Sequence, residues 1–322
     1  MFLQQLQQEL AASFARGRCE PEGVSRSRAA AASHETMAWR RLAQRCAPIG
    51  APAALLGLGA ARCEDTMQVP RTKKTPKELP EYFVPKVPYP AWDADWDGRR
   101  RARAEAKKRG APPAPTRHIL LVRHGQYDET SRDDDKRILT PLGRDQAVAT
   151  GLRLRSLLDS GSPKSPIKMV SSGLVRAKET ADLIAPCLPE DRLVYADPNP
   201  DLNEGRPAQV IPGRPYSNEA VRIDQKRVER AFRDIFRRAD PRDDGARHEY
   251  EIVVCHGNVI RYMTLRALQL PPEAWLRLCT FNCSLTYLVV RPTGSVSLRA
   301  LGDVGHLDPP LVTFSMHHGI EW

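Results

Sequence analysis

Two short apolar runs, each followed at once by a histidine and a glycine, place the strongest constraint on the fold of this 322-residue chain. The run 118–122 leads into Arg123-His124-Gly125, and the run 251–255 leads into His256-Gly257. Runs of this length and composition are typical of strands that are buried on both faces of a parallel sheet. Ligand sites in such sheets lie beyond the C-terminal ends of the strands, which is where both histidines are expected.

Helix and strand patterns alternate between and after these two runs. Thr140 and Pro141 predict the cap and first position of a helix that runs to Leu158. Ser171 and Ser172 are expected to cap the next helix. The remaining predicted elements are a strand at 167–170, an amphipathic helix at 218–239, and a hairpin formed by 284–290 and 296–301. This alternation predicts a layered α/β fold with a largely parallel sheet.

The formal net charge of +10 is concentrated in the first third of the chain. Residues 1–110 hold 20 of the 49 basic residues but only 12 of the 39 acidic ones, whereas residues 111–322 are nearly balanced. The basic stretch 99–109 has no interleaved aromatic residues, which nucleic-acid strands would stack on. No nucleic-acid partner is therefore expected.

Residues 1–68 are predicted to be a mostly disordered targeting or anchoring region. No acidic residue occurs from Thr36 to Cys63, and basic, acid-poor sequence is typical of mitochondrial and plastid presequences. The uncharged run 46–61 is shorter than the roughly 20 residues that span a bilayer. A cleavable presequence, a membrane anchor and a disordered tail all stay open, as does a start at Met1 or at Met37.

Residues 69–110 are predicted to be a proline-rich and basic linker. It contains the segment Trp92-Asp93-Ala94-Asp95-Trp96-Asp97. Because tryptophan is a frequent interface anchor, this segment is a candidate for self-association or docking. The alternative is that both tryptophans fold back on their own domain. Residues 111–322 are predicted to form the catalytic domain.

The residues beside the two histidines are suited to phosphate chemistry. Arg123 and Arg176 supply fork-shaped donors for a dianion, and Gly125 allows backbone N–H groups to approach a ligand closely. A neutral imidazole at His124 can attack phosphorus to form a phosphohistidine. Departure of the alcohol then needs an acid, and Glu204 is the candidate.

These motifs together resemble the histidine phosphatase (phosphoglycerate mutase-like) superfamily. The resemblance rests on Leu121-Val122-Arg123-His124-Gly125, 139–143, 171–177 and His256-Gly257. It implies a three-layer α/β/α sandwich with a mostly parallel central sheet, and neither a cofactor nor a metal. It also implies catalytic roles for His124, Glu204 and His256, and phosphate binding by Arg123, Arg176, Gly125 and Asn258.

Within that superfamily, the chain resembles the mitochondrial serine/threonine protein phosphatases over about 92–305. The matching segments include 231–233, 238–240, 255–262, 271–278 and 301–303. The resemblance implies phosphoprotein substrates, a phosphohistidine intermediate and a mitochondrial location, associated with the outer or the inner membrane. The segment 92–97 also resembles a multimerisation motif of these enzymes, which implies a homo-oligomer held by Trp92, Asp93, Trp96 and Asp97.

Other activities remain as alternatives to a protein serine/threonine phosphatase. One is a phosphohistidine or small-metabolite phosphatase of the same superfamily, and another is a multimeric mitochondrial scaffold with residual activity. Mutase activity is not expected, because the Asn and further substrate-binding residues that metabolic mutases carry are not found in 128–136. No counterpart of the adaptor-binding segment of the animal phosphatases is found, so that partner is not implied.

The cysteines do not favour a thiol mechanism or a zinc site. Cys255 and Arg261 have the C-x5-R spacing of cysteine-dependent phosphatases, but Gly257 is the only small residue in a loop that would need several. The seven cysteines form no CxxC pair, so neither a structural zinc site nor a disulfide scaffold is expected. The adjacent His317 and His318 are interpreted as part of a disordered tail.

Overall fold

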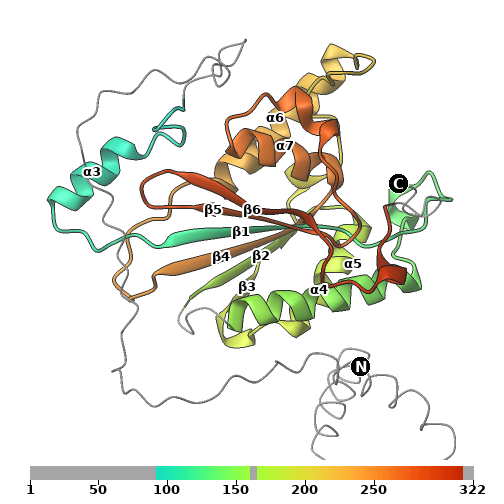
Figure 1. Cartoon of the computed structure of the whole chain (residues 1–322), viewed down its shortest axis with the longest axis horizontal. Coiled ribbons are helices and arrows are strands. Elements are labelled where there is room, and N and C mark those ends of the chain that lie inside the picture. Colours follow the sequence, from blue (N-terminus) through green and yellow to red (C-terminus); the bar gives the residue numbers. More distant parts are fainter. Residues whose placement is uncertain (1–91, 160–164, 315–322) are drawn as a thin grey trace, which may run out of the picture. The chain divides into compact units, whose positions relative to one another are not determined.

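A six-stranded sheet forms the centre of the computed structural model, which describes residues 92–159 and 165–314 (Figure 1). The strand order is β3-β2-β4-β1-β5-β6. β3, β2, β4 and β1 are parallel neighbours, β5 is antiparallel to β1, and β6 is antiparallel to β5. Every strand except β5 therefore runs in the same direction, which confirms the mostly parallel sheet. The strands are β1 (Thr116–Arg123), β2 (Ile167–Ser171), β3 (Leu193–Tyr195), β4 (His248–Cys255), β5 (Leu285–Val290) and β6 (Val296–Asp303).

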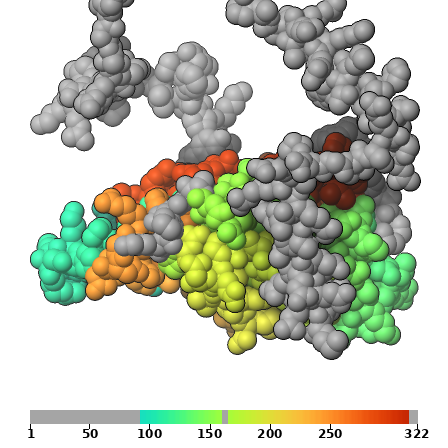
Figure 2. Space-filling model, turned by 90° about the horizontal axis from the view of Figure 1, so that it is seen from below, coloured from blue at the N-terminus to red at the C-terminus, as the bar shows by residue number. Residues whose placement is uncertain are grey.

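Helices cover both faces of this sheet, as expected for a three-layer α/β/α sandwich. Side chains alternate along β1, so that Leu120 and Val122 pack with α4 and α5, whereas Ile119 and Leu121 pack with α6 and α7. Figure 1 shows α4 and α5 on one side of the strands and α6 and α7 on the other, and Figure 2 views the molecule from the α4 and α5 side. The helices are α3 (Arg100–Lys108), α4 (Pro141–Asp159), α5 (Val175–Ile184), α6 (Asn218–Ile235) and α7 (Gly257–Ala267).

The helix ends agree with the predictions in one case and differ in two. At the start of α4, the Thr140 hydroxyl accepts a hydrogen bond from Gly143 N at 3.0 Å, which confirms the predicted cap. The prediction that Ser171 and Ser172 cap α5 is wrong, since α5 begins at Val175 with no side-chain cap. Ser171 instead ends β2, and the Ser172 hydroxyl contacts a histidine.

The amphipathic helix predicted at 218–239 ends four residues early. α6 stops at Ile235, and Phe236 has extended backbone angles. Phe236 and Ala239 are nevertheless buried, so the chain keeps filling the core after it has left the helix. Buried residues beyond a helix end continue the apolar pattern, and sequence periodicity therefore overestimates the helix length.

The segment 92–97 packs on the domain in both of its halves. The Asp93 backbone N–H donates a hydrogen bond to Gln269 Oε1 at 2.7 Å, and Asp93 O accepts one from Gln269 Nε2 at 2.9 Å. The Trp96 indole donates a hydrogen bond to Gly294 O at 2.8 Å, and Asp97 forms a buried ion pair with Arg238. Trp92 is 44% exposed. Of the two tryptophans, only Trp96 is therefore anchored on its own domain.

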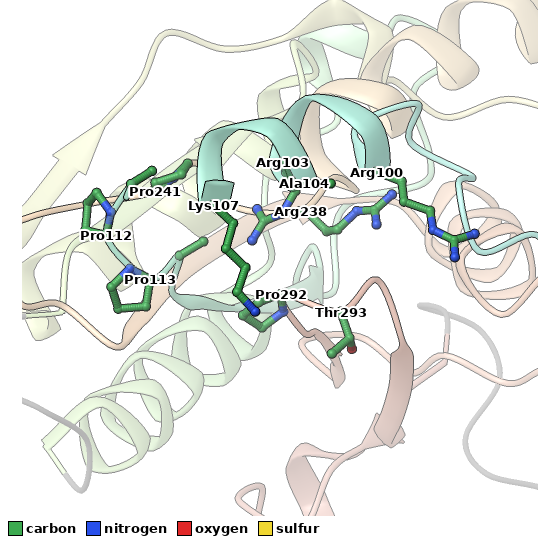
Figure 3. A pocket seen from close by; sticks show the side chains of 12 residues that line it. Arg100, Arg103, Ala104, Lys107, Pro112, Pro113, Arg238, Pro241, Pro292 and Thr293 are labelled. Carbon is green, nitrogen blue, oxygen red and sulfur yellow. The ribbon is translucent and has the colours of Figure 1, made fainter. Parts of the chain in front are cut away.

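The helix α3, which follows this segment, buries none of its residues. It borders a cavity of about 640 Å³, with Arg103 and Lys107 on one side and Pro292 and Thr293 of the β5–β6 hairpin on the other (Figure 3). None of the predicted catalytic or phosphate-binding residues lines this cavity.

Several predictions fall on residues outside the described part of the chain. These are the targeting or anchoring region 1–68, including the run 46–61, most of the proline-rich linker, and the pair His317-His318. The boundaries at 68, 110 and 111 stay predictions. Across 92–159 and 165–314, none of the helices has both the length and the apolar character that crossing a membrane requires.

A buried chain of hydrogen bonds links three strands at the end of the sheet opposite the two His-Gly pairs. His118 lies on β1. Its Nδ1 is 2.6 Å from the Tyr287 hydroxyl, and its Nε2 is 2.9 Å from His248 Nδ1. Its ring also stacks on Tyr250. Burial, aided by the nearby His248 and Arg299, lowers the pKa of His118 to about 4.

We expect this histidine to make the protein less stable in mild acid. The unfolded chain binds a proton at His118 near pH 6.5, whereas the folded chain does so only near pH 4, so the free energy of unfolding falls as the pH drops through this range. Between pH 7 and pH 5 the contribution of His118 to this loss is about 2 kcal/mol. Urea unfolding at pH 7, 6 and 5 measures the loss, and His118→Gln should reduce it by about that amount. An unchanged dependence in that variant would contradict this assignment.

Candidate active site

The register between β1 and β4 brings the two predicted histidines together. Arg123 pairs with Cys255 at the ends of these parallel strands, and His124 N donates a hydrogen bond to Cys255 O at 3.0 Å. The residues that follow, His124 and His256, then lie side by side with ring centroids 5.0 Å apart. Both are almost fully buried.

The hydrogen bond at His124 leaves one ring nitrogen available for attack. His124 Nδ1 lies 2.8 Å from Gly125 O, and a carbonyl oxygen can only accept, so Nδ1 carries the proton. The other nitrogen, Nε2, then holds a lone pair in the neutral ring. Burial, with Arg123 and Arg176 nearby, lowers the pKa of His124 well below its usual value. The ring is therefore neutral and nucleophilic at neutral pH.

Three nitrogens of the predicted phosphate ligands are buried without a hydrogen-bond partner within the described residues. They are Arg123 Nε, Arg176 Nε and His256 Nδ1. Buried donors normally have partners, and a phosphate oxygen is an acceptor that would satisfy them. The other ring nitrogen of His256 is 2.7 Å from the Ser172 hydroxyl at the end of β2. This part of the site thus combines two guanidinium groups with the imidazole of His256, which is hydrogen-bonded to Ser172. The combination suits a phosphate dianion.

Glu204 joins this cluster from a loop that precedes α6. Its carboxylate accepts a hydrogen bond from Gly205 N at 3.0 Å. Burial raises the pKa of Glu204, while Arg123, Arg176 and the backbone N–H groups of Gly205 and Asn258 oppose the rise. A carboxyl group with a raised pKa can hold a proton for a leaving group, which is what a general acid needs.

The two remaining predicted phosphate-binding residues have close neighbours in the protein. Gly125 N donates to the Thr180 hydroxyl at 3.0 Å, and a Cβ on Gly125 would lie only 2.5 Å from Gly143 O. The Asn258 amide donates to Gly205 O at 3.0 Å and accepts from Arg261 at 3.3 Å. Its side chain therefore contacts the loop that carries Glu204, and its phosphate-binding role stays a prediction.

Sequence reasoning missed several side chains that surround this cluster. Asp134 accepts a hydrogen bond from Arg176 at 3.0 Å. The guanidinium carbon of Arg176 lies 4.7 Å from the centre of the Tyr127 ring, and that of Arg123 lies 4.9 Å from the centre of the Phe314 ring. Their position depends on loops and on the C-terminal segment, for which no periodic pattern exists. The acidic, polar character of 128–136 was the only available signal for Asp134.

A cavity of about 710 Å³ lies next to Glu204 and extends over the exposed side of α6. Asp134, Leu174, Asn203 and the α6 residues Arg222, Ile223 and Lys226 are among the residues that line it. The cavity is a suitable place for the group that carries the phosphate. Charged side chains of both signs surround it.

The alternative thiol site does not have the properties of a reactive cysteine. Cys255 is fully buried at the end of β4, and burial raises the pKa of its thiol far above the usual value. Arg261 lies on α7, and its guanidinium carbon is 5.7 Å from the centre of the Phe314 ring. Within 92–159 and 165–314, no group of three or more His, Cys, Asp or Glu side chains is arranged to hold a metal ion.

The chain resembles known phosphatases in sequence. The family model of the histidine phosphatase superfamily (branch 1) matches residues 119–303. The serine/threonine-protein phosphatase PGAM5, mitochondrial, of Xenopus tropicalis is 46% identical over 205 residues, covering 62% of this chain and 69% of that protein. The human protein of the same name is 42% identical over 261 residues, covering 74% of this chain and 86% of that protein. Among solved structures, a phosphoglycerate mutase from Plasmodium falciparum is 33% identical, with a TM-score of 0.41, and covers 65% of this chain and 99% of that one.

The contact between Asp134 and Arg176 predicts that Asp134→Asn binds phosphate more tightly than the unchanged protein. The Asp134 carboxylate competes with an anion for the guanidinium, and an ion pair that is half exposed is worth about 0.5–1 kcal/mol. The Kd for inorganic phosphate, measured by calorimetry, should therefore fall about two- to fivefold. The neighbouring Asp135→Asn serves as the control. Equal affinities in Asp134→Asn and Asp135→Asn would contradict this competition.

Proposed function

Because this chain belongs to the histidine phosphatase superfamily, we propose that it is a protein serine/threonine phosphatase that works through a phosphohistidine at His124. The observation that carries the proposal is the protonation pattern at His124, whose Nδ1 is hydrogen-bonded to Gly125 O while Nε2 keeps its lone pair. The names of the relatives supply the substrate class, phosphoserine and phosphothreonine in proteins.

In the first step, His124 Nε2 attacks phosphorus and the bond from phosphorus to the serine or threonine oxygen breaks. Arg123, Arg176 and His256 hold the other phosphate oxygens and stabilise their charge in the transition state. The leaving oxygen is a poor leaving group unless it is protonated, and Glu204 gives it a proton. The products of this step are the dephosphorylated protein, a phosphohistidine and the Glu204 carboxylate.

In the second step, water hydrolyses the phosphohistidine. The Glu204 carboxylate takes a proton from the water, whose oxygen bonds to phosphorus while the bond to His124 Nε2 breaks. Phosphate leaves, and both His124 and Glu204 regain their starting protonation states. No cofactor takes part in either step.

Two substitutions separate this mechanism from a thiol mechanism. His124→Ala should abolish hydrolysis of a phosphothreonine peptide, because it removes the nitrogen that attacks phosphorus. Cys255→Ser should keep near-normal activity. Rapid mixing with a ³²P-labelled peptide should trap an acid-labile phosphoenzyme that His124→Ala lacks. Hydrolysis that survives His124→Ala and disappears in Cys255→Ser would refute the proposal.

The mitochondrial location is proposed on two grounds. The relatives are named as mitochondrial proteins, and residues 1–68 have a basic, acid-poor composition. Association with a mitochondrial membrane through 46–61 belongs to the same proposal.

Self-association through the segment 92–97 is the second part of the proposal. Trp96 and Asp97 hold the segment against the domain, while Trp92 stays 44% exposed and Asp93 is exposed beside it. An exposed tryptophan that is held on a rigid surface is a suitable anchor for a second copy of the chain. Gln269 also holds the backbone of Asp93, so the segment presents the exposed Trp92 side chain to a neighbouring subunit.

Trp92→Ala should therefore reduce the mass of the particle in multi-angle light scattering while leaving the thermal unfolding temperature within a few degrees of normal. Ile223→Ala, which removes another exposed apolar side chain on α6, is the control. The double variant Trp92→Ala with Trp96→Ala should have the same effect on mass or a larger one. An unchanged mass in both tryptophan variants would rule out this mode of assembly.

A further inference from the structure

The loop that carries Glu204 has little secondary structure of its own, and one arginine on α6 supplies partners for three of its carbonyl groups. Arg227 Nη1 donates to Asp201 O at 3.2 Å and to Asn203 O, and Arg227 Nη2 donates to Glu204 O at 2.8 Å. Backbone carbonyls outside helices and strands need partners when they are buried, and here a single guanidinium serves three of them.

Arg227 is itself oriented by Asp224, one turn earlier on α6. The Asp224 carboxylate accepts hydrogen bonds from Arg227 Nη2 at 2.7 Å and from Nε at 3.1 Å. It also accepts from Arg206 N at 2.7 Å, so Asp224 contacts the loop directly as well. The two side chains are largely buried.

All five N–H groups of Arg227 are used in these contacts. None is left over for a phosphate or a peptide, so Arg227 does not have the properties of a substrate ligand. The function of this pair therefore concerns the loop.

The fit between the pair and the loop is close. A Cβ added to Gly205 would lie 2.2 Å from Arg227 Nη2 and 2.6 Å from Asp224 Oδ1. Only glycine allows this approach next to Glu204. The Asn258 amide, which donates to Gly205 O, holds the loop from the side of α7. The backbone around Glu204 is thus held from α6 by Arg227 and from α7 by Asn258.

We propose that Arg227, oriented by Asp224, is a positioning residue for the acid–base step. It holds the backbone on both sides of Glu204 so that the carboxyl group can reach the leaving oxygen. This inference rests on the proposed function, since it takes Glu204 as the proton donor. A proton donor must lie within hydrogen-bond reach of the atom that it protonates, so a loosened loop slows this step more than it slows phosphate binding.

Two substrates that differ in their need for an acid test the inference. A phosphothreonine peptide has an alkoxide leaving group and needs protonation, whereas p-nitrophenyl phosphate has a good leaving group and does not. The measured quantity is kcat/KM, which covers the steps up to departure of the leaving group. Arg227→Met keeps an unbranched, flexible side chain but removes every donor. It should lower kcat/KM for the peptide about 10- to 100-fold and for p-nitrophenyl phosphate less than threefold.

Four further variants make this result specific. Glu204→Gln should show the same substrate dependence with a larger loss, and combining it with Arg227→Met should add little. Asp224→Asn keeps Arg227 but weakens its orientation. It should therefore lower kcat/KM for the peptide more than for p-nitrophenyl phosphate, by a smaller factor than Arg227→Met does, and it replaces Arg227→Met if that variant does not fold. Arg233→Met is the matched control, because Arg233 lies on the same helix, is 80% exposed and pairs with Glu229 at 4.0 Å rather than with the loop.

The outcomes separate the inference from the proposed function. Equal losses on both substrates in Arg227→Met and Asp224→Asn would mean that the pair only stabilises the fold, and normal activity would mean that the loop does not need it. Either result overturns the inference alone if Glu204→Gln still lowers kcat/KM more for the peptide than for p-nitrophenyl phosphate. If Glu204→Gln has no substrate dependence, Glu204 is not the acid, and the proposed mechanism falls together with the inference.

Discussion

The parallel pairing of β1 with β4 is the constraint on which the rest of this structure depends. The two strands end level with each other, so the residues after them, His124 and His256, meet beyond the same edge of the sheet. β2 pairs with the other side of β4 and ends beside them, which brings Ser172 to His256. A shift of one residue in the register would turn a histidine to the opposite face of the sheet. The two core layers hold the register because Leu120 and Leu121 must face different helices.

Burial at this edge sets two protonation states at once. Removal from water disfavours a charged group, so the pKa of His124 falls and the pKa of Glu204 rises. Desolvation therefore favours both a neutral nucleophile and a carboxyl group that can hold a proton. The nearby Arg123 and Arg176 strengthen the first effect and moderate the second. The loop of Glu204 lies at the same edge, and Arg227 supplies hydrogen bonds to three of its carbonyl groups.

Most of the fold was predictable because both strand and helix patterns repeat with fixed periods. The sequence patterns predicted β1, β2, β4, the β5–β6 hairpin and the α4 cap at Thr140. They missed β3, whose three residues form an edge strand, and α7, which is buried on almost all sides. The cap expected at Ser171 and Ser172 was wrong, because local propensity for a cap does not reveal that Ser172 is needed by His256, far away in the chain.

By itself, the sequence determined the α/β class, the two His-Gly strand ends and the residue types suited to phosphate, because these follow from local patterns and from the chemistry of side chains. The tertiary structure decided which nitrogen of His124 is free, that Asp134 contacts Arg176, and that Arg227 holds the Glu204 loop. It also decided that Trp96 docks on the domain while Trp92 stays exposed. These features depend on contacts between residues far apart in the chain, and such contacts exist only once the layers have packed.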